Sequence, residues 1–258
     1  MAPDRVISTV DPDTRHGHKT QARSFDGYKG HVAIDPDAEL VTATAVTPGN
    51  AGDASVALAL LGTELAEAAP ADPPVVYGDS AYGAGSVLAA LDEAGAVSRV
   101  KVQPANGVPG QFTKDDFTID LDARTVTCPT GRTVPIRGRV ERYAEFGRAC
   151  LACPLVGRCT TAPRGRTIQI NLHEALLAAG RAASRDPVWR ADYRATRPKV
   201  ERKLAHLVRR KHGGRRARVR GRQKVGADFS LLAAAVNLAR LAVLGLTGSS
   251  GTWAVEPA

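Results

Sequence analysis

The sequence predicts an α/β fold with a mixed sheet, and three observations lead to this prediction. Two β-branched, alternating segments separated by a Pro-Asp turn are typical of a hairpin. Ala- and Leu-rich segments bounded by turn residues predict helices. Short apolar segments follow these helices, and such alternation indicates an α/β sheet. The predicted elements are, in order, strands at 28–35 and 39–46, a helix at 54–68, a strand at 74–77, a helix at 85–94 and a strand at 97–102.

Turn and cap residues define the ends of these elements. Residues 1–28 are polar and turn-rich, so we expect irregular structure there, apart from a short strand at 6–10. Asp53 stands directly before the first helix and is expected to cap it, because its side chain can accept hydrogen bonds from free backbone amides. Gly95 stands directly after the second helix and is expected to end it.

The composition changes at residue 103. Residues 103–165 are rich in Pro, Gly and Thr, hold all four cysteines, and contain short strand-like segments at 117–121 and 125–128. We therefore predict a small inserted module. It divides the α/β domain into a first part, 1–102, and a second part, 166–258, that carries a basic arm and a C-terminal helix.

The last part of the chain is expected to be helical, with helices at 173–183, 188–212 and 229–244. Pro198 is expected either to begin a helix within the second segment or to kink it. Asp228 is expected to cap the third helix.

Composition excludes several classes of protein. The chain has 258 residues, 43% of them apolar and 24% charged, which is typical of a globular protein with a sizeable core. Four cysteines are too few for a disulfide-dense scaffold. The N-terminus has no apolar segment of the signal-peptide kind, and the apolar stretch 229–246 contains Asn237 and Arg240, which are costly in a bilayer. We expect a cytoplasmic protein without a membrane partner.

The positive charge is concentrated in one segment. The chain has 35 Lys and Arg against 26 Asp and Glu, for a net charge of +9. Residues 194–224 hold fourteen of these basic residues and one acid, Glu201, so this segment carries +13 and the rest of the chain carries −4. Concentrated positive charge favours a polyanionic partner. A solvated basic surface is the alternative.

Arginines alternate with small or apolar residues near the end of this segment. They are Arg216, Arg218, Arg220 and Arg222. In an extended strand they would share one face and form a row of guanidinium groups. Arg binds phosphate oxygens through two parallel hydrogen bonds, so we favour contacts to a nucleic-acid backbone. The candidate contact residues are Arg209, Arg210, Lys211, Arg215, Arg216, Arg218, Arg220, Arg222 and Lys224.

The four cysteines have the spacing C-x21-C-x2-C-x5-C. They are Cys128, Cys150, Cys153 and Cys159. A C-x2-C pair lets two thiolates from one tight turn reach a tetrahedral ion, so we predict a structural zinc site. Two pairs of structural or free cysteines are the alternative, because a buried free cysteine behaves as a small apolar side chain. A redox C-x2-C is less favoured, because four cysteines cluster here.

Asp79 is the first of two candidate catalytic carboxylates. It follows the strand at 74–77, and ligands of α/β sheets bind outside the carboxyl ends of strands. A turn or cap aspartate is the alternative.

Glu201 is the second candidate, as the only acid in the basic segment. Tyr193, Arg197 and Glu201 recur every four residues, which would place them on one face of a continuous helix. A surface Glu paired with an Arg is the alternative. A carboxylate beside DNA phosphates needs a divalent metal between them, and two Mg²⁺ ions serve phosphodiester chemistry in this way.

Seven stretches, in their order along the chain, resemble motifs of the bacterial insertion-sequence transposases of the DDE type. The likeness covers nearly the whole chain and is closest to the group with a four-cysteine insertion before the last catalytic helix. Each motif alone is weak, whereas their order is specific. The stretches are D-P-D-T-R-H-G-H-K-T (11–20), G-Y-K-G-H-V-A-I-D (27–35), V-T-P-G-N-A-G-D (46–53), G-D-S-A-Y-G (78–83), the cysteine module, R-P-K-V-E-R-K-L-A-H-L (197–207) and G-G-R-R-A-R-V-R-G-R (213–222).

The resemblance implies an RNase H-like mixed sheet flanked by helices, with a zinc-ribbon-like module inserted. It implies that Asp79 is the second catalytic Asp and Glu201 the catalytic Glu, which together hold two Mg²⁺ ions. Tyr193 and Arg197 would support Glu201, as in the Tyr-Arg-Glu signature of related transposases, although the spacing differs by one residue and the final Lys has no clean match. The family's first catalytic Asp, on the first central strand, lies upstream of D-P-D-T-R. Ten residues precede Asp11, so we expect that strand and that Asp to be absent.

The implied activity is cleavage of double-stranded DNA by metal-activated water at transposon ends, followed by transfer of the freed 3′-hydroxyl to target DNA. The protein would act in a DNA complex, with a homo-oligomer as one form. We expect this chain to be a truncated and impaired copy. One alternative is a non-catalytic, zinc-containing DNA-binding protein derived from a transposase. Another is an interaction module that merely happens to be basic.

Overall fold

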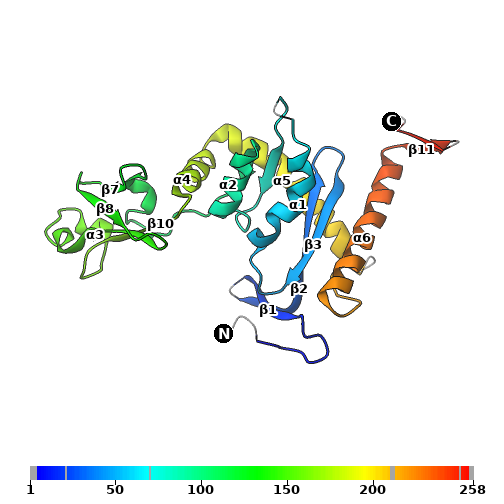
Figure 1. Cartoon of the computed structure of the whole chain (residues 1–258), viewed down its shortest axis with the longest axis horizontal. Coiled ribbons are helices and arrows are strands. Elements are labelled where there is room, and N and C mark those ends of the chain that lie inside the picture. Colours follow the sequence, from blue (N-terminus) through cyan, green and yellow to red (C-terminus); the bar gives the residue numbers. More distant parts are fainter. Residues whose placement is uncertain (1–4, 21, 70, 210–212, 250, 256–258) are drawn as a thin grey trace. The chain divides into compact units, whose positions relative to one another are not determined.

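The computed structural model describes residues 5–20, 22–69, 71–209, 213–249 and 251–255 (Figure 1). These residues form six α-helices and several small sheets, which confirms the mixed α/β class. The described strands form four separate sheets and not a single RNase H-like sheet. The chain divides into two compact units, which are described separately. The first unit is Met1–Tyr77 with Ala191–Ala258, and the second is Gly78–Arg190.

The first unit is built on an antiparallel sheet in the order β1-β2-β3. The strands are Arg15–Thr20, Arg23–Asp35 and Leu40–Pro48, so the predicted hairpin is confirmed. Two helices pack on β2 and β3, α1 (Ala57–Ala66) and α6 (Arg222–Val243), and Figure 1 shows them on opposite sides of this hairpin.

The core of this unit lies between α6 and the hairpin. Its buried members are Val41, Leu207, Phe229, Leu232, Ala233 and Val236. The amide of Asn237 accepts a hydrogen bond from the backbone N of Val41 and donates one to its carbonyl oxygen, both at 2.8 Å. The guanidinium of Arg240 donates to the carbonyl oxygen of Ala38 at 2.8 Å. The two polar residues of this apolar helix therefore fasten it to the sheet.

The sequence motifs at 27–35 and 46–53 contact each other. The ammonium group of Lys29 donates to the carbonyl oxygen of Ala51 and to Asp53 Oδ1, both at 2.8 Å. The predicted cap at Asp53 is wrong, because its carboxylate is held by Lys29 and makes no cap hydrogen bond. A short 3₁₀ turn, η1 (Asp53–Val56), leads into α1 instead.

Other predicted element ends also change. Residues 6–10 form no strand, and Val6 and Val10 are exposed. Helix α5 (Pro187–Val208) runs through Pro198, so no new helix begins there. Helix α6 begins at Arg222, seven residues before its predicted start.

The second unit contains an antiparallel sheet in the order β10-β9-β8-β7-β6. Its strands are Thr118–Asp120, Thr125–Thr127, Thr133–Arg137, Arg142–Glu145 and Thr167–Ile170, numbered β6 to β10. Its core consists of Phe117, Val126, Ile136, Ala144, Phe146, Ile168 and Ile170. The two strand-like segments predicted in the inserted module are confirmed as β6 and β7.

The remaining helices of this unit are α2 (Gly85–Glu93), α3 (Val156–Cys159) and α4 (Glu174–Ala183). Gly95 ends α2 as predicted, with a φ of +70°. Strand β5 is Val97–Val100, and β4 (Val75–Gly78) lies where the first unit passes into the second. Two 3₁₀ turns, η2 (Lys114–Asp116) and η3 (Gly147–Cys150), belong to the cysteine-containing part. In the first unit, β11 (Leu246–Ser249) and β12 (Thr252–Val255) form a hairpin after α6.

A buried group of ion pairs joins η2 to α4. Glu174 is 1% exposed and accepts hydrogen bonds from Lys114 Nζ and Arg181 Nη2, both at 2.9 Å. Arg181 Nε also donates to Asp115 Oδ1 at 2.7 Å, and Arg185 pairs with the same carboxylate. Buried charges are tolerated only when paired in this way, so this group fixes the start of the cysteine module on α4.

Candidate functional site

Helix α5 carries the predicted Tyr193, Arg197 and Glu201. The helix is continuous, so these residues recur on one face as predicted. Arg197 Nη2 lies 3.8 Å from Glu201 Oε1, and the Glu201 side chain is 66% exposed. A carboxylate with so much exposure is accessible to a ligand, and a pair at this distance holds it loosely.

Part of the basic segment is neutralised within the first unit. Arg202 makes two hydrogen bonds to the carboxylate of Glu39, and these hold the pKa of Glu39 below its ordinary value. Lys199 Nζ lies 3.7 Å from Asp37 Oδ1. Lys203 is 3% exposed, and burial lowers its pKa. Three of the cations of α5 therefore pair with or pack near the β2–β3 turn.

The predicted row of arginines in an extended strand is wrong. Residues 213–221 form turns and bends, and α6 begins at Arg222. The side chains are nevertheless accessible, since Arg209, Arg215, Arg216, Arg218, Arg220, Arg222 and Lys224 are all exposed. Arg210 and Lys211 lie outside the described residues. We name the segment from Arg215 to Lys224 the basic arm.

Arg218 is the member of the basic arm with a clear acidic partner. Its guanidinium binds the carboxylate of Asp228 through two hydrogen bonds, of 3.1 Å and 2.7 Å. Asp228 is therefore an ion-pair partner and not the predicted cap of the last helix.

The D-P-D motif anchors the end of the basic arm. Asp11 Oδ1 accepts hydrogen bonds from the Tyr28 hydroxyl at 2.7 Å and from the backbone N of Gly221 at 3.1 Å. Asp13 Oδ2 accepts one from the backbone N of Arg222 at 2.9 Å. Burial and the hydrogen bond to Asp11 raise the pKa of Tyr28. Asp11 thus has a structural role at the start of α6.

Asp79 follows β4 in a tight turn. Its Oδ1 accepts a hydrogen bond from the backbone N of Ala81 at 3.0 Å, and its carbonyl accepts one from the N of Tyr82 at 3.1 Å. Gly83 packs against the backbone of Lys101, where a Cβ atom would come within 2.4 Å of a carbonyl oxygen. Asp79 belongs to the second unit and Glu201 to the first.

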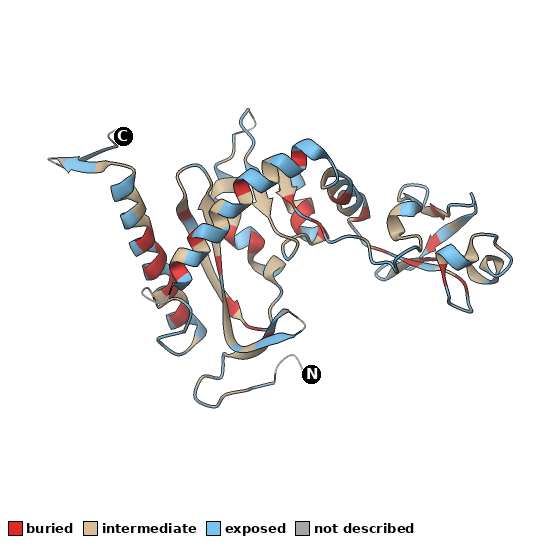
Figure 2. Ribbon diagram, turned by 180° about the vertical axis from the view of Figure 1, so that it is seen from behind, coloured by how far each residue is buried: buried red, intermediate tan, exposed pale blue. Residues whose placement is uncertain are grey.

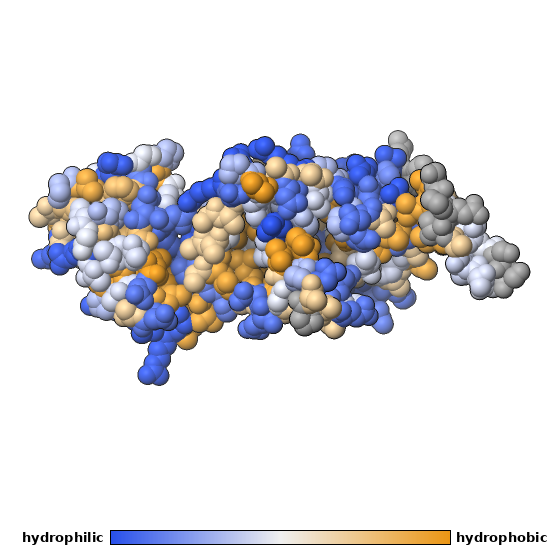
Figure 3. All heavy atoms as spheres, turned by 90° about the horizontal axis from the view of Figure 1, so that it is seen from above, coloured by the Kyte–Doolittle hydropathy of each residue, from blue (hydrophilic) through white to orange (hydrophobic). Residues whose placement is uncertain are grey.

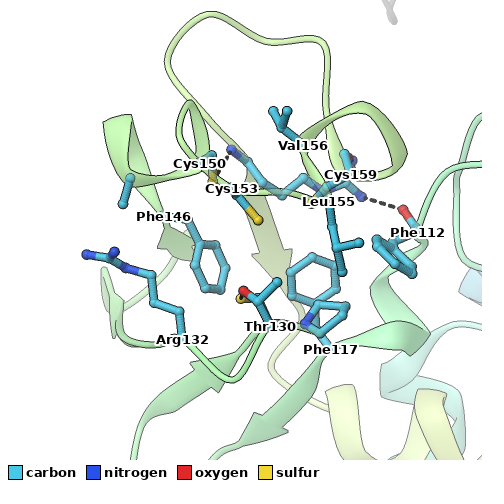
Figure 4. Close-up of a pocket in the computed structure, with 14 residues that line it drawn as sticks. Phe112, Phe117, Thr130, Arg132, Phe146, Cys150, Cys153, Leu155, Val156 and Cys159 are labelled. Carbon is cyan, nitrogen blue, oxygen red and sulfur yellow. Dashed lines mark hydrogen bonds between the residues drawn. The ribbon is translucent and has the colours of Figure 1, made fainter.

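All four cysteines line one cavity of about 30 Å³ in the second unit. Cys150 and Cys153 come from one turn, in which the N of Cys153 donates to the carbonyl of Cys150 at 3.1 Å. Figure 4 shows these two with Cys159, the last residue of α3, and with Phe146 and Phe117 beside them. Within the described ranges, no three His, Cys, Asp or Glu side chains are grouped closely enough to hold a metal.

The thiols differ in their surroundings. Burial raises the pKa of Cys128, but hydrogen bonds from Thr130 and the backbone amides of its turn outweigh this effect, so the pKa is lowered. Burial raises the pKa of Cys159, and the three other thiols raise it further.

Comparison with protein families found one match, in the later part of the chain. Residues 127–242 match the family model described as the transposase DDE domain. These residues are therefore similar to a transposase DDE domain. The DDE domain contains the four cysteines, Glu201 and the basic arm, and it begins after Asp79. Neither the curated proteins nor the solved structures gave a match. The resemblance seen in the sequence is confirmed for these residues. A DDE domain implies a DNA transposase, and such enzymes bind DNA and generally use a divalent metal.

Proposed function

We propose that this chain acts in transposition of DNA, with an RNase H-like catalytic fold in which Asp79 and Glu201 hold Mg²⁺. The transposase DDE domain at 127–242 carries this proposal. It is supported by the continuous helix that presents Glu201 and by the hydrogen bond from the Tyr77 hydroxyl to Asp192 at 2.8 Å. That bond joins β4 to α5 within the first unit.

The residues fit a divalent metal in chemical terms. Carboxylate oxygens are the ligands that Mg²⁺ prefers, and Glu201 offers an exposed pair of them. When bound between such carboxylates and DNA, Mg²⁺ supplies activation of a nucleophile and stabilisation of the leaving oxygen. Arg197 would support Glu201 from the same helical face, and the basic arm would hold the DNA backbone in place.

We expect cleavage by this chain alone to be absent or severely impaired, since the resemblance assigns it two of the three catalytic carboxylates. The measurement is nicking of supercoiled plasmid DNA in Mg²⁺ or Mn²⁺, with the Asp79→Ala variant beside the unchanged chain. Cleavage that requires the metal and disappears in Asp79→Ala would contradict this expectation and would show that two carboxylates suffice.

A non-catalytic DNA-binding protein is the second candidate function. The accessible basic arm and the shared cysteine cavity favour it, because each is formed within one unit and neither depends on Asp79. In this case, salt-dependent DNA binding should survive both Asp79→Ala and Glu201→Ala, with no nuclease activity in Mg²⁺ or Mn²⁺. Loss of DNA binding in either variant would argue against it.

We also propose a structural Zn²⁺ held by Cys128, Cys150, Cys153 and Cys159. The four side chains line one cavity, and cysteine thiolates are ligands that a structural Zn²⁺ prefers. A reducing, cytoplasmic location suits both the free thiols and a DNA partner.

Elemental analysis of the purified chain under reducing conditions should find one zinc per chain. The chain has four cysteines in all, so Cys153→Ser should release the ion and loosen the β6–β10 sheet. Thr133→Ser, which keeps the hydroxyl at an exposed position of β8, is the control variant and should retain the zinc. A chain that contains no zinc would contradict the site.

A further inference from the structure

The D-P-D motif forms a turn that brings two carboxylates to the end of the basic arm. Pro12 stands at the second position of the turn that begins at Asp11, where proline is favoured because its ring fixes φ. The turn places the carboxylates of Asp11 and Asp13 on two successive backbone amides. They accept hydrogen bonds from the backbone N of Gly221 at 3.1 Å and from that of Arg222 at 2.9 Å. In Figure 1 the segment that leads to β1 accordingly lies beside the start of α6.

The contact at Gly221 is fixed from both sides. Gly221 has a φ of +83°, which glycine adopts at little cost, and it directly precedes α6. The Tyr28 hydroxyl, on β2, donates to the same oxygen of Asp11 at 2.7 Å, so the carboxylate that holds Gly221 is itself held by the sheet. A chain of contacts therefore runs from β2 through Asp11 to the point where the basic arm enters α6.

The basic arm is held at two further points. A Cβ atom at Gly214, directly before the arm, would overlap the carbonyl oxygen of Leu207 and the side chain of Leu232, so the chain packs closely there. The two hydrogen bonds between Arg218 and Asp228 hold the middle of the arm. Figure 2 shows buried positions along α6, whereas residues 215–220 before it are exposed. The backbone of the arm is thus held while its cations stay accessible.

The accessible cations gather at the start of α6. Arg216, Arg220, Arg222 and Lys224 are exposed there. The end of the same helix differs, because Val243 is 72% exposed and Figure 3 shows hydrophobic surface in that region. Contacts to DNA phosphates are therefore expected at the start of α6, which is where the D-P-D motif binds.

We propose that Asp11 and Asp13 are positioning residues for DNA binding, which hold the basic arm in one arrangement before DNA is bound. An arm that is already ordered loses less conformational entropy on binding than a free segment does, and this raises the affinity. The inference rests on the proposed contact between the basic arm and DNA. It adds two acids to the residues on which that contact depends.

The negative charge of these aspartates separates positioning from simple electrostatics. A carboxylate beside a DNA-binding surface repels phosphates, so charge alone predicts tighter binding when Asp11 and Asp13 are replaced. Positioning predicts weaker binding when their hydrogen bonds are lost. Asparagine keeps an oxygen that accepts these bonds and removes only the charge, so alanine and asparagine variants test the two effects independently.

Fluorescence anisotropy of the full chain with a labelled duplex, at about 0.15 M salt, tests the proposal. Asp11→Ala combined with Asp13→Ala should lower the affinity about tenfold. Asp11→Asn combined with Asp13→Asn should bind at least as tightly as the unchanged chain. Tyr28→Phe removes the hydrogen bond to Asp11 and leaves the net charge unchanged, so it should lower the affinity about threefold.

The control variant removes the same charge elsewhere in the first unit. Asp37 pairs with Lys199 and Asp53 pairs with Lys29. Asp37→Ala combined with Asp53→Ala therefore also removes two acids and two ion pairs. This variant should not lower the affinity for the duplex.

Hydrogen exchange without DNA measures the order of the arm itself. The amides of Gly221 and Arg222 should exchange at least about tenfold faster in the double alanine variant than in the unchanged chain, because they lose their acceptors. Slow exchange that persists in the β2–β3 hairpin would show that the unit is still folded.

Two results would overturn the positioning role. One is duplex binding by the double alanine variant that is unchanged or tighter, and the other is equal exchange of the Gly221 and Arg222 amides in both chains. If the double alanine variant does not fold, Tyr28→Phe decides in the same way. Failure of the unchanged chain to bind the duplex would instead refute the proposed DNA partner, and this role with it.

Discussion

Replacing the four alternating arginines of the basic arm by alanine is expected to lower the affinity for double-stranded DNA by about 100- to 1,000-fold at 0.15 M salt. The residues are Arg216, Arg218, Arg220 and Arg222, and all are exposed. Each phosphate contact contributes about 0.9 to the slope of log affinity against log salt. The slope should therefore fall by about 3, and by less than four full contacts because Arg218 is shared with Asp228.

The control for this experiment removes the same charge elsewhere. Arg137, Arg139, Arg148 and Arg164 are exposed in the second unit, and their fourfold alanine variant should retain most of the affinity and the slope. Fluorescence anisotropy with a labelled duplex at several salt concentrations measures both quantities. Equal losses in the two variants would show that net charge, and not the basic arm, governs binding.

Glu174→Gln is expected to lower the free energy of unfolding of the second unit by about 3–5 kcal/mol. The substitution removes the negative charge that Arg181, 7% exposed, and Lys114 share, and it leaves those cations partly uncompensated in the interior. Urea unfolding can be followed through Trp189, which is the only tryptophan left when Trp253 is replaced by Phe. Glu141→Gln, at an exposed position of the same unit, should change stability little.

The same group gives stability a defined dependence on pH. Burial raises the pKa of Glu174, but hydrogen bonds from the amide of Asn171, Lys114 and Arg181 outweigh it and lower the pKa. Because the folded-state pKa is depressed, the contribution of Glu174 is present above the ordinary pKa of a glutamate and is lost as the pH falls through the depressed value. The difference between Glu174→Gln and the unchanged chain should therefore shrink in strong acid. An undiminished difference there would contradict this assignment.

The spacing of apolar residues along the chain predicted most of the helices and strands in both units. The alternation at 28–35 and 39–46 predicted the hairpin because one of its faces is buried under α6. The predicted helix caps at Asp53 and Asp228 were wrong. Each carboxylate instead pairs with a cation, Lys29 or Arg218, that the neighbouring sequence does not reveal. Tertiary partners override local propensity in this way.

The candidate site could be predicted only in part. Chain periodicity placed Arg197 and Glu201 on one helical face, and the continuous α5 bears this out. The anchoring of Gly221 by Asp11 depends on a contact between residues 210 positions apart, which no local pattern reveals. The ion pairs of Glu174 with Lys114 and Arg181 were not predicted. The sequence around Glu174 shows only the pattern of an ordinary helix.

Binding of Mn²⁺ to the chain–DNA complex tests the central claim most directly, because it does not require the transposon end sequence. Water-proton relaxation measures the bound ion in the unchanged chain, in Asp79→Asn, in Glu201→Gln and in Asp120→Asn, an exposed carboxylate on β6. If Asp79 and Glu201 hold the same metal, either single change should abolish binding and Asp120→Asn should preserve it. Binding that survives both Asp79→Asn and Glu201→Gln would contradict the claim.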